Sequence, residues 1–137
     1  MTNVDLAQRA GISAPPCLRR LRALEEDGII VGYHAEVSAE ALDYKITAFV
    51  HVKLGSNNDH DLREFEEAIS RWDYVRECHL LVGDYDFLLR VVAKNWDDYQ
   101  RFLTAELTSA PHVSQTKSSL AVRRSKFAPG VPIEEGK

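Results

Sequence analysis

The sequence predicts an α+β protein, in which two N-terminal helices precede a unit of strand, helix, strand, strand, helix and strand. Three observations carry this prediction. Apolar residues recur at helical spacing on both sides of Gly11, residues 45–54 alternate between apolar and other side chains, and two apolar runs flank Gly83.

The first helix is predicted at residues 3–10, with Gly11 as its stop signal. A second helix begins at Ser13, whose hydroxyl is expected to cap the free amides. Pro15 and Pro16 then fall in the first turn, where a missing amide proton costs little.

Gly28 is expected to end the second helix. Residues 29–37 follow, and their apolar residues around Gly32 predict a short β-ribbon.

The rest of the chain begins with a strand over residues 45–54, whose alternation predicts one deeply buried face. Residues 55–59 are loop and cap, and an amphipathic helix extends to about Trp72. Residues 77–92 then form a hairpin, because their apolar runs are bounded by Gly and Asp at residues 83–86.

A capping pair, Asn95 with Asp98, opens the next helix, which Pro111 ends. Residues 113–127 supply the last strand. This order is that of a ferredoxin-like βαββαβ unit.

The predicted organisation has three parts. Residues 1–43 form one small domain with a linker, residues 44–127 form the ferredoxin-like domain, and residues 128–137 form a mobile tail. Neither domain has a large core, so dimerisation through the sheet is an expected source of stability.

Composition excludes several classes of protein. A net charge of −4 argues against a protein that coats nucleic acid over its whole surface, so a DNA contact must be local. Two distant cysteines, Cys17 and Cys78, fit reduced thiols. The N-terminus is polar and no stretch approaches a membrane span, so we expect a soluble, cytoplasmic protein without a membrane partner. The histidines lack metal-ligand spacing, and no cofactor is implied.

The first candidate site is the exposed face of the second helix. The sequence predicts a first helix, a turn at a glycine and a basic second helix, which is the order of elements in a helix-turn-helix. Such a motif places its second helix in the DNA major groove. A solvated basic face is the plain alternative. The candidate DNA contacts are Ser13, Pro16, Arg19, Arg20 and Arg22.

The second candidate site is the hairpin tip, Gly83-Asp84-Tyr85-Asp86. A turn needs only Gly83 and one Asp, so the turn itself does not require Tyr85 or the second carboxylate. Two carboxylates and a phenol could bind an ammonium group through charge-assisted hydrogen bonds. The alternative is that both carboxylates are solvated turn residues.

Two motifs in this chain resemble the Lrp/AsnC (feast/famine) regulators. One is residues 13–33, SAPPCLRRLRALEEDGIIVGY, and the other is Glu77-Cys78-His79 followed by residues 83–89, GDYDFLL. The resemblance covers nearly all of the chain up to about Lys126. It implies an N-terminal winged helix-turn-helix, a ferredoxin-like effector domain, and homodimers that assemble into tetramers or octamers.

The resemblance also implies a function and an effector site. The function is regulation of transcription at double-stranded promoter DNA, in response to an amino acid bound between dimers. By matching position, the effector residues would be His79, Gly83, Asp84, Tyr85, Asp86, Gln115, Thr116 and Ser118. We expect replacement of Asp86 with Ala to abolish the effector response and leave the fold.

Members of the family begin with a further apolar helix, so we expect a partial winged helix-turn-helix in this chain. One alternative is therefore an amino-acid-sensing oligomerisation module that does not bind DNA. Another is an enzyme, because a ferredoxin-like fold alone does not fix function. No nucleophile has an evident base partner, and we expect no enzymatic activity.

Overall fold

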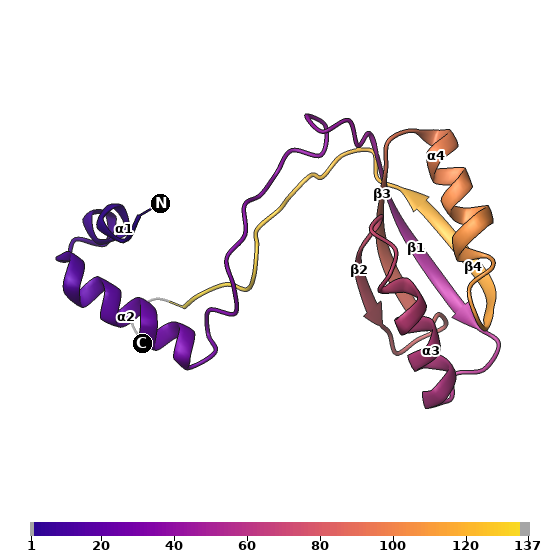
Figure 1. Cartoon of the computed structure of the whole chain (residues 1–137), viewed down its shortest axis with the longest axis horizontal. Helices are drawn as coiled ribbons and strands as arrows, with labels where there is room; N and C mark the ends of the chain where they lie inside the picture. The colour runs from indigo at the N-terminus through magenta and orange to yellow at the C-terminus, as the bar shows by residue number, and fades with distance from the viewer. Residues whose placement is uncertain (1, 135–137) are drawn as a thin grey trace. The chain divides into compact units, whose positions relative to one another are not determined.

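The computed structural model describes residues 2–134 (Figure 1). The chain divides into two compact units, with the boundary between Val37 and Ser38. Each unit is described by itself below.

The first unit contains α1 (Asn3–Ala10) and α2 (Ala14–Glu26). Thr2 and Asp5 form a reciprocal capping box at the start of α1, and Gly11 ends the helix in the left-handed conformation, with φ 73°. Both predicted helices and the glycine stop are confirmed.

Ser13 occupies the cap position of α2, but the prediction that its hydroxyl caps the helix is wrong. A capping side chain accepts from the backbone N–H of the second or third helical residue. Those residues are Pro15 and Pro16, which have no N–H. The prolines that suit the first turn therefore remove the partners of the cap.

The predicted β-ribbon at residues 29–37 is also wrong, because the structure has no strand there. Val31 is 94% exposed and Tyr33 68% exposed. An isolated two-stranded ribbon is marginal in water unless it packs against something else. The Tyr33 hydroxyl instead donates a hydrogen bond to Glu25, at 2.8 Å.

The second unit is a four-stranded antiparallel sheet with helices on one face (Figure 1). The strand order is β2-β3-β1-β4, and the predicted ferredoxin-like arrangement is confirmed. The elements in chain order are β1 (Ile46–Leu54), α3 (Asp59–Ile69), β2 (Val75–Leu80), β3 (Phe87–Ala93), α4 (Trp96–Arg101), η1 (Phe102–Leu107) and β4 (Val113–Leu120).

Several local predictions for this unit hold. Asn58 and Asn95 cap α3 and α4 through their side chains, the latter by accepting from the Asp98 amide at 2.8 Å. Helix α3 ends at Ile69, earlier than predicted, although Trp72 still packs against the core. The segment η1 continues α4 as a wider π-helix, which the sequence did not predict.

The core lies between the sheet and its two helices. In β1, Ala48, Val50 and Val52 are fully buried, whereas Phe49 and Lys53 are exposed on the other face. We call that other face the open face, formed by Phe49, His51 and Lys53 of β1 with their sheet partners Arg90, Leu88, Ser119, Lys117 and Gln115. The predicted alternation is confirmed.

The last strand is shorter than the predicted residues 113–127, since β4 ends at Leu120. Its sheet neighbour is β1, and Ala121 makes the final bond by donating to the Thr47 carbonyl at 2.8 Å. Because β1 begins at Ile46, residues beyond 122 have no β1 partner with which to extend the ladder.

Candidate functional site

The hairpin between β2 and β3 ends in residues 81–86, which include the predicted effector tip. Two backbone bonds fix this loop. The Leu81 amide donates to the Asp86 carbonyl at 2.8 Å, and the Asp86 amide donates to the Val52 carbonyl at 2.9 Å. The tip is therefore attached to the end of β1, and not only to its own hairpin.

The carboxylate of Asp86 also has a structural partner, since it accepts a hydrogen bond from the Leu54 amide at 2.8 Å. Leu54 is 4% exposed and lies where the register between β1 and β4 shifts. A ladder irregularity leaves a backbone donor to be satisfied by another group. This bond argues against the expectation that replacing Asp86 with Ala would leave the fold.

Tyr85 turns toward the open face. Its ring lies against the His51 ring with centroids 5.2 Å apart, and its hydroxyl accepts from the Gln115 amide nitrogen at 3.4 Å. His51 Nδ1 is buried and has no hydrogen-bond partner. The structure thus brings the predicted residues Tyr85 and Gln115 together, and adds His51, which sequence reasoning missed.

Thr116 and Ser118 lie on the opposite side of β4 from Gln115, because successive strand residues alternate between faces. They pair with Val52 and Val50, whose side chains enter the core. The Ser118 hydroxyl accepts from the hydroxyl of Tyr99 at 2.7 Å. The structure therefore divides the predicted β4 residues between the two faces.

Tyr99 is 1% exposed, and burial raises the pKa of its hydroxyl. Its phenol remains a hydrogen-bond donor over the physiological range. Ser118 therefore already has a donor within its own chain.

His79 lies beside a charge pair on β2 and β3. Its Nε2 is 3.4 Å from Glu77, which forms an ion pair with Arg90. The Arg90 hydrogen bond holds the pKa of Glu77 below its ordinary value. Gly83 and Asp84 are exposed in the loop, where they are accessible to a ligand.

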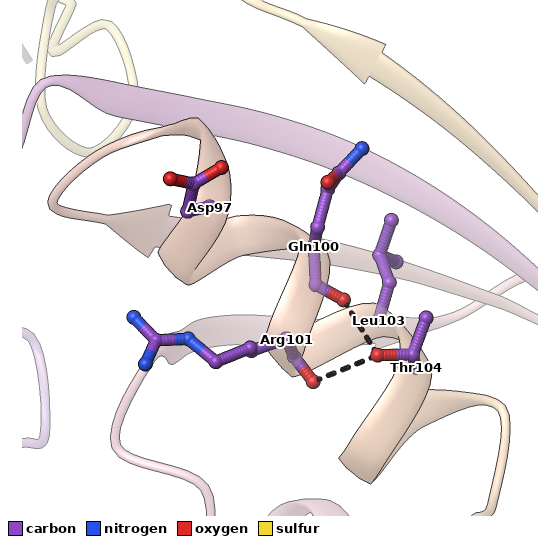
Figure 2. Close-up of a pocket in the computed structure, with 5 residues that line it drawn as sticks. All are labelled: Asp97, Gln100, Arg101, Leu103 and Thr104. Atoms are coloured by element: carbon purple, nitrogen blue, oxygen red, sulfur yellow. Dashed lines mark hydrogen bonds between the residues drawn. The ribbon is translucent and has the colours of Figure 1, made fainter.

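A surface hollow runs along α4 and η1, separate from these predicted residues. Figure 2 shows its lining side chains, Asp97, Gln100, Arg101, Leu103 and Thr104. The Thr104 hydroxyl is within hydrogen-bond distance of the carbonyls of Gln100 and Arg101, at 3.0 and 3.5 Å. The hydroxyl therefore satisfies its own helix, and none of the predicted effector residues lines this hollow.

The other candidate surface lies on α2. Arg19, Arg20 and Arg22 are exposed, while Cys17 is buried and Leu21 is half-buried. Ser13 is exposed at the helix start and Pro16 is half-buried. The helix thus presents its positive charge away from its contact with α1, as the sequence predicts.

Within residues 2–134, no group of three or more His, Cys, Asp and Glu side chains is arranged to hold a metal ion. In the same part of the chain, no helix is long and apolar enough to cross a membrane. Burial raises the pKa of the Cys78 thiol to about 12. Such a thiol is a poor nucleophile at neutral pH.

Comparison with known families gives two matches, one in each of the two units. Residues 1–31 match a winged helix-turn-helix DNA-binding domain, and residues 47–131 match the Lrp/AsnC ligand-binding domain.

Individual proteins agree with these matches. The chain is 45% identical to a leucine-responsive regulatory protein of Rhizobium meliloti, over 97% of this chain and 85% of that protein. It is 40% identical to a Bkd operon transcriptional regulator of Pseudomonas aeruginosa, over 94% and 84%. These relatives are regulators and not enzymes, which confirms the predicted class.

Solved structures of regulators share the fold. A transcriptional regulator from Neisseria meningitidis, in complex with L-Met, superposes with a TM-score of 0.89 at 30% identity, over 96% of this chain and 85% of that one. An AsnC family regulator from Agrobacterium tumefaciens gives a TM-score of 0.86 at 30% identity, over 96% and 86%. The chain belongs to the Lrp/AsnC family of transcriptional regulators.

Proposed function

We propose that this chain regulates transcription by binding promoter DNA through the exposed face of α2, and that an amino acid bound at the hairpin tip modulates this binding. The observation that carries the DNA part is the exposure of Arg19, Arg20 and Arg22, in a segment that matches a DNA-binding domain. Arginines on such a helix reach phosphates and guanine edges, and Ser13 and Pro16 would flank the backbone.

The DNA contact is tested with Arg20→Ala and fluorescence anisotropy on the DNA upstream of the chain's own gene. Loss of one phosphate contact should weaken binding and lower the salt slope by about 0.9. Loss of a guanine contact should instead cost about 1–3 kcal/mol of preference for that DNA. Arg63→Ala is the matched control, because Arg63 lies on α3 in an ion pair with Asp59 at 2.7 Å. If Arg20→Ala and the control behave alike, Arg20 is not at the DNA surface.

For the effector, we propose that carboxylates of the tip bind the ammonium group of an amino acid. Asp84 is exposed, and one oxygen of Asp86 accepts the Leu54 amide and leaves the other for a ligand. Gly83 and Tyr85 complete the tip, with Gln115 beside Tyr85. His79, Thr116 and Ser118 would contribute only if a ligand or a second subunit reaches them from outside the tip.

L-leucine and L-methionine are the first probes, because one relative is a leucine-responsive regulatory protein and one similar structure is a complex with L-Met. D-leucine is the stereochemical control. Titration calorimetry should detect the L-amino acid, and Asp84→Asn should weaken that binding. Equal binding by the variant would place the ammonium site elsewhere.

We propose a homodimer in which the open faces of two sheets stack, with further assembly to tetramers or octamers. The supporting observation is Phe49, a large apolar side chain that is 39% exposed on β1, one of the two inner strands of the sheet. Phe49→Glu should shift sedimentation toward the monomer, and an unchanged oligomer would refute this face. The free cysteines fit a reducing compartment such as the cytoplasm.

A further inference from the structure

Charge is unevenly distributed along this chain. Between Glu106 and Glu134 there is no Asp or Glu, whereas Lys117, Arg123, Arg124 and Lys126 all lie in that interval. The interval therefore carries about +4, and since the whole chain carries −4, the rest carries −8. Three of the four cations fall within residues 123–126.

The structure leaves the three cations of residues 123–126 exposed. After Ala121 makes the last sheet bond, residues 122–134 form neither helix nor strand, and all of them are exposed. The Arg124 guanidinium lies 3.8 Å from the centre of the Phe127 ring. This cation–π contact holds one charge in place within the segment. Arg123 and Lys126 are exposed on either side of it.

A short basic segment in a chain with a net negative charge attracts negatively charged partners. The rest of the chain has a net negative charge, so binding of a polyanion is concentrated where cations gather. The DNA backbone is such a polyanion, and neutralising its phosphates releases condensed counterions. A segment in the same chain as a DNA-binding unit also meets DNA at a high effective concentration.

We propose that residues 121–127 form an accessory DNA contact, in which Arg123 and Lys126 bind backbone phosphates without reading sequence. This inference rests on the proposed DNA binding by α2 and extends the footprint to the second unit. An acidic protein surface, including that of a second copy of this chain, is the competing partner.

The test uses the full chain carrying Arg123→Gln and Lys126→Gln together. The matched control carries Arg63→Gln and Arg71→Gln, which remove the same charge from α3, where both guanidinium groups are in ion pairs. Anisotropy is measured over a range of salt concentrations on the upstream DNA and on a scrambled duplex of equal length.

The double variant should lose about 0.9 from the salt slope for each phosphate contact, or about 1.8 per chain, on both duplexes. The preference for the upstream DNA should not change. The control should keep nearly the parent slope.

Equal slopes in the parent, variant and control would overturn the inference, as would equal losses in variant and control. An oligomer that dissociates in the variant without DNA, at an unchanged slope per chain, would assign the segment to protein contact. If the parent binds both duplexes equally, sequence-specific regulation by α2 fails, while the slope comparison still decides the accessory contact. If the parent binds neither duplex, both proposals fail.

Discussion

Replacement of Asp86 with Ala should destabilise the second unit as well as impair effector binding. The Asp86 carboxylate accepts the Leu54 amide at 2.8 Å, across 32 positions of sequence. Alanine removes the acceptor and leaves a backbone donor on a residue that is 4% exposed.

The magnitude follows from that geometry. A hydrogen bond to a charged group contributes about 1.5–3 kcal/mol, and a buried donor without a partner costs about 1–3 kcal/mol. Asp86 is itself half-buried, so water can partly replace it. We expect the free energy of unfolding to fall by about 1–2 kcal/mol. For a domain of this size, each kcal/mol lowers the Tm by about 4–8 °C.

Urea denaturation followed by tryptophan fluorescence measures this loss directly, because both tryptophans, Trp72 and Trp96, lie in the second unit. Asp86→Asn keeps an acceptor oxygen and should cost less than Asp86→Ala. Asp84→Ala is the control, since Asp84 is exposed and a surface change of this kind alters stability by about 0.5 kcal/mol or less.

The reasoning is refuted if Asp86→Ala unfolds at the same urea concentration as the parent chain. The Asn variant separates the two roles, because it preserves the Leu54 bond and removes the charge. If it binds L-leucine or L-methionine as the parent does, the Asp86 charge does not hold the ammonium group.

Three further predictions concern the same unit. Arg90 holds the pKa of Glu77 below its ordinary value of 4.5, so ionised Glu77 stabilises the fold above that pH, and the contribution is lost as pH falls through the lowered pKa. In Glu77→Gln, the free energy of unfolding should therefore fall less steeply below pH 4.5 than in the parent chain. The same pH dependence in both proteins would contradict this. Ser118→Ala should lower the Tm more than Tyr99→Phe, because it leaves the buried phenol without its partner; the reverse order would show that water replaces Ser118. His112 has φ 69°, so His112→Gly should be more stable than His112→Ala by about 1 kcal/mol in urea denaturation, and equal midpoints would show that the backbone relaxes.

The sequence by itself determined the order and type of the main elements. Alternation in residues 46–54 and helical spacing around Phe65 and Tyr99 identified which side chains are buried. These patterns succeed because side-chain direction repeats along a strand or helix as a property of the local backbone.

Local sequence signals failed where strand formation depended on a neighbouring strand or core. The apolar residues of 29–37 predicted strands, but these residues have no sheet or core to pack against. The predicted last strand is shorter than expected, because β1 begins at Ile46 and offers no further residues to pair with. The prediction that Ser13 caps α2 failed for a reason visible in the sequence, because Pro15 and Pro16 lack the amide protons that the hydroxyl would accept.

The sequence predicted a site at the hairpin tip, but it did not show which contact each residue of the tip makes. Only the tertiary structure placed Asp86 on the Leu54 amide, Tyr85 against His51, and Ser118 beside Tyr99. These pairs are far apart along the chain, and they meet because strand pairing and the packing of α4 on the sheet bring them together. Register is set by how the whole sheet packs on its helices, so no local pattern around these residues contains it.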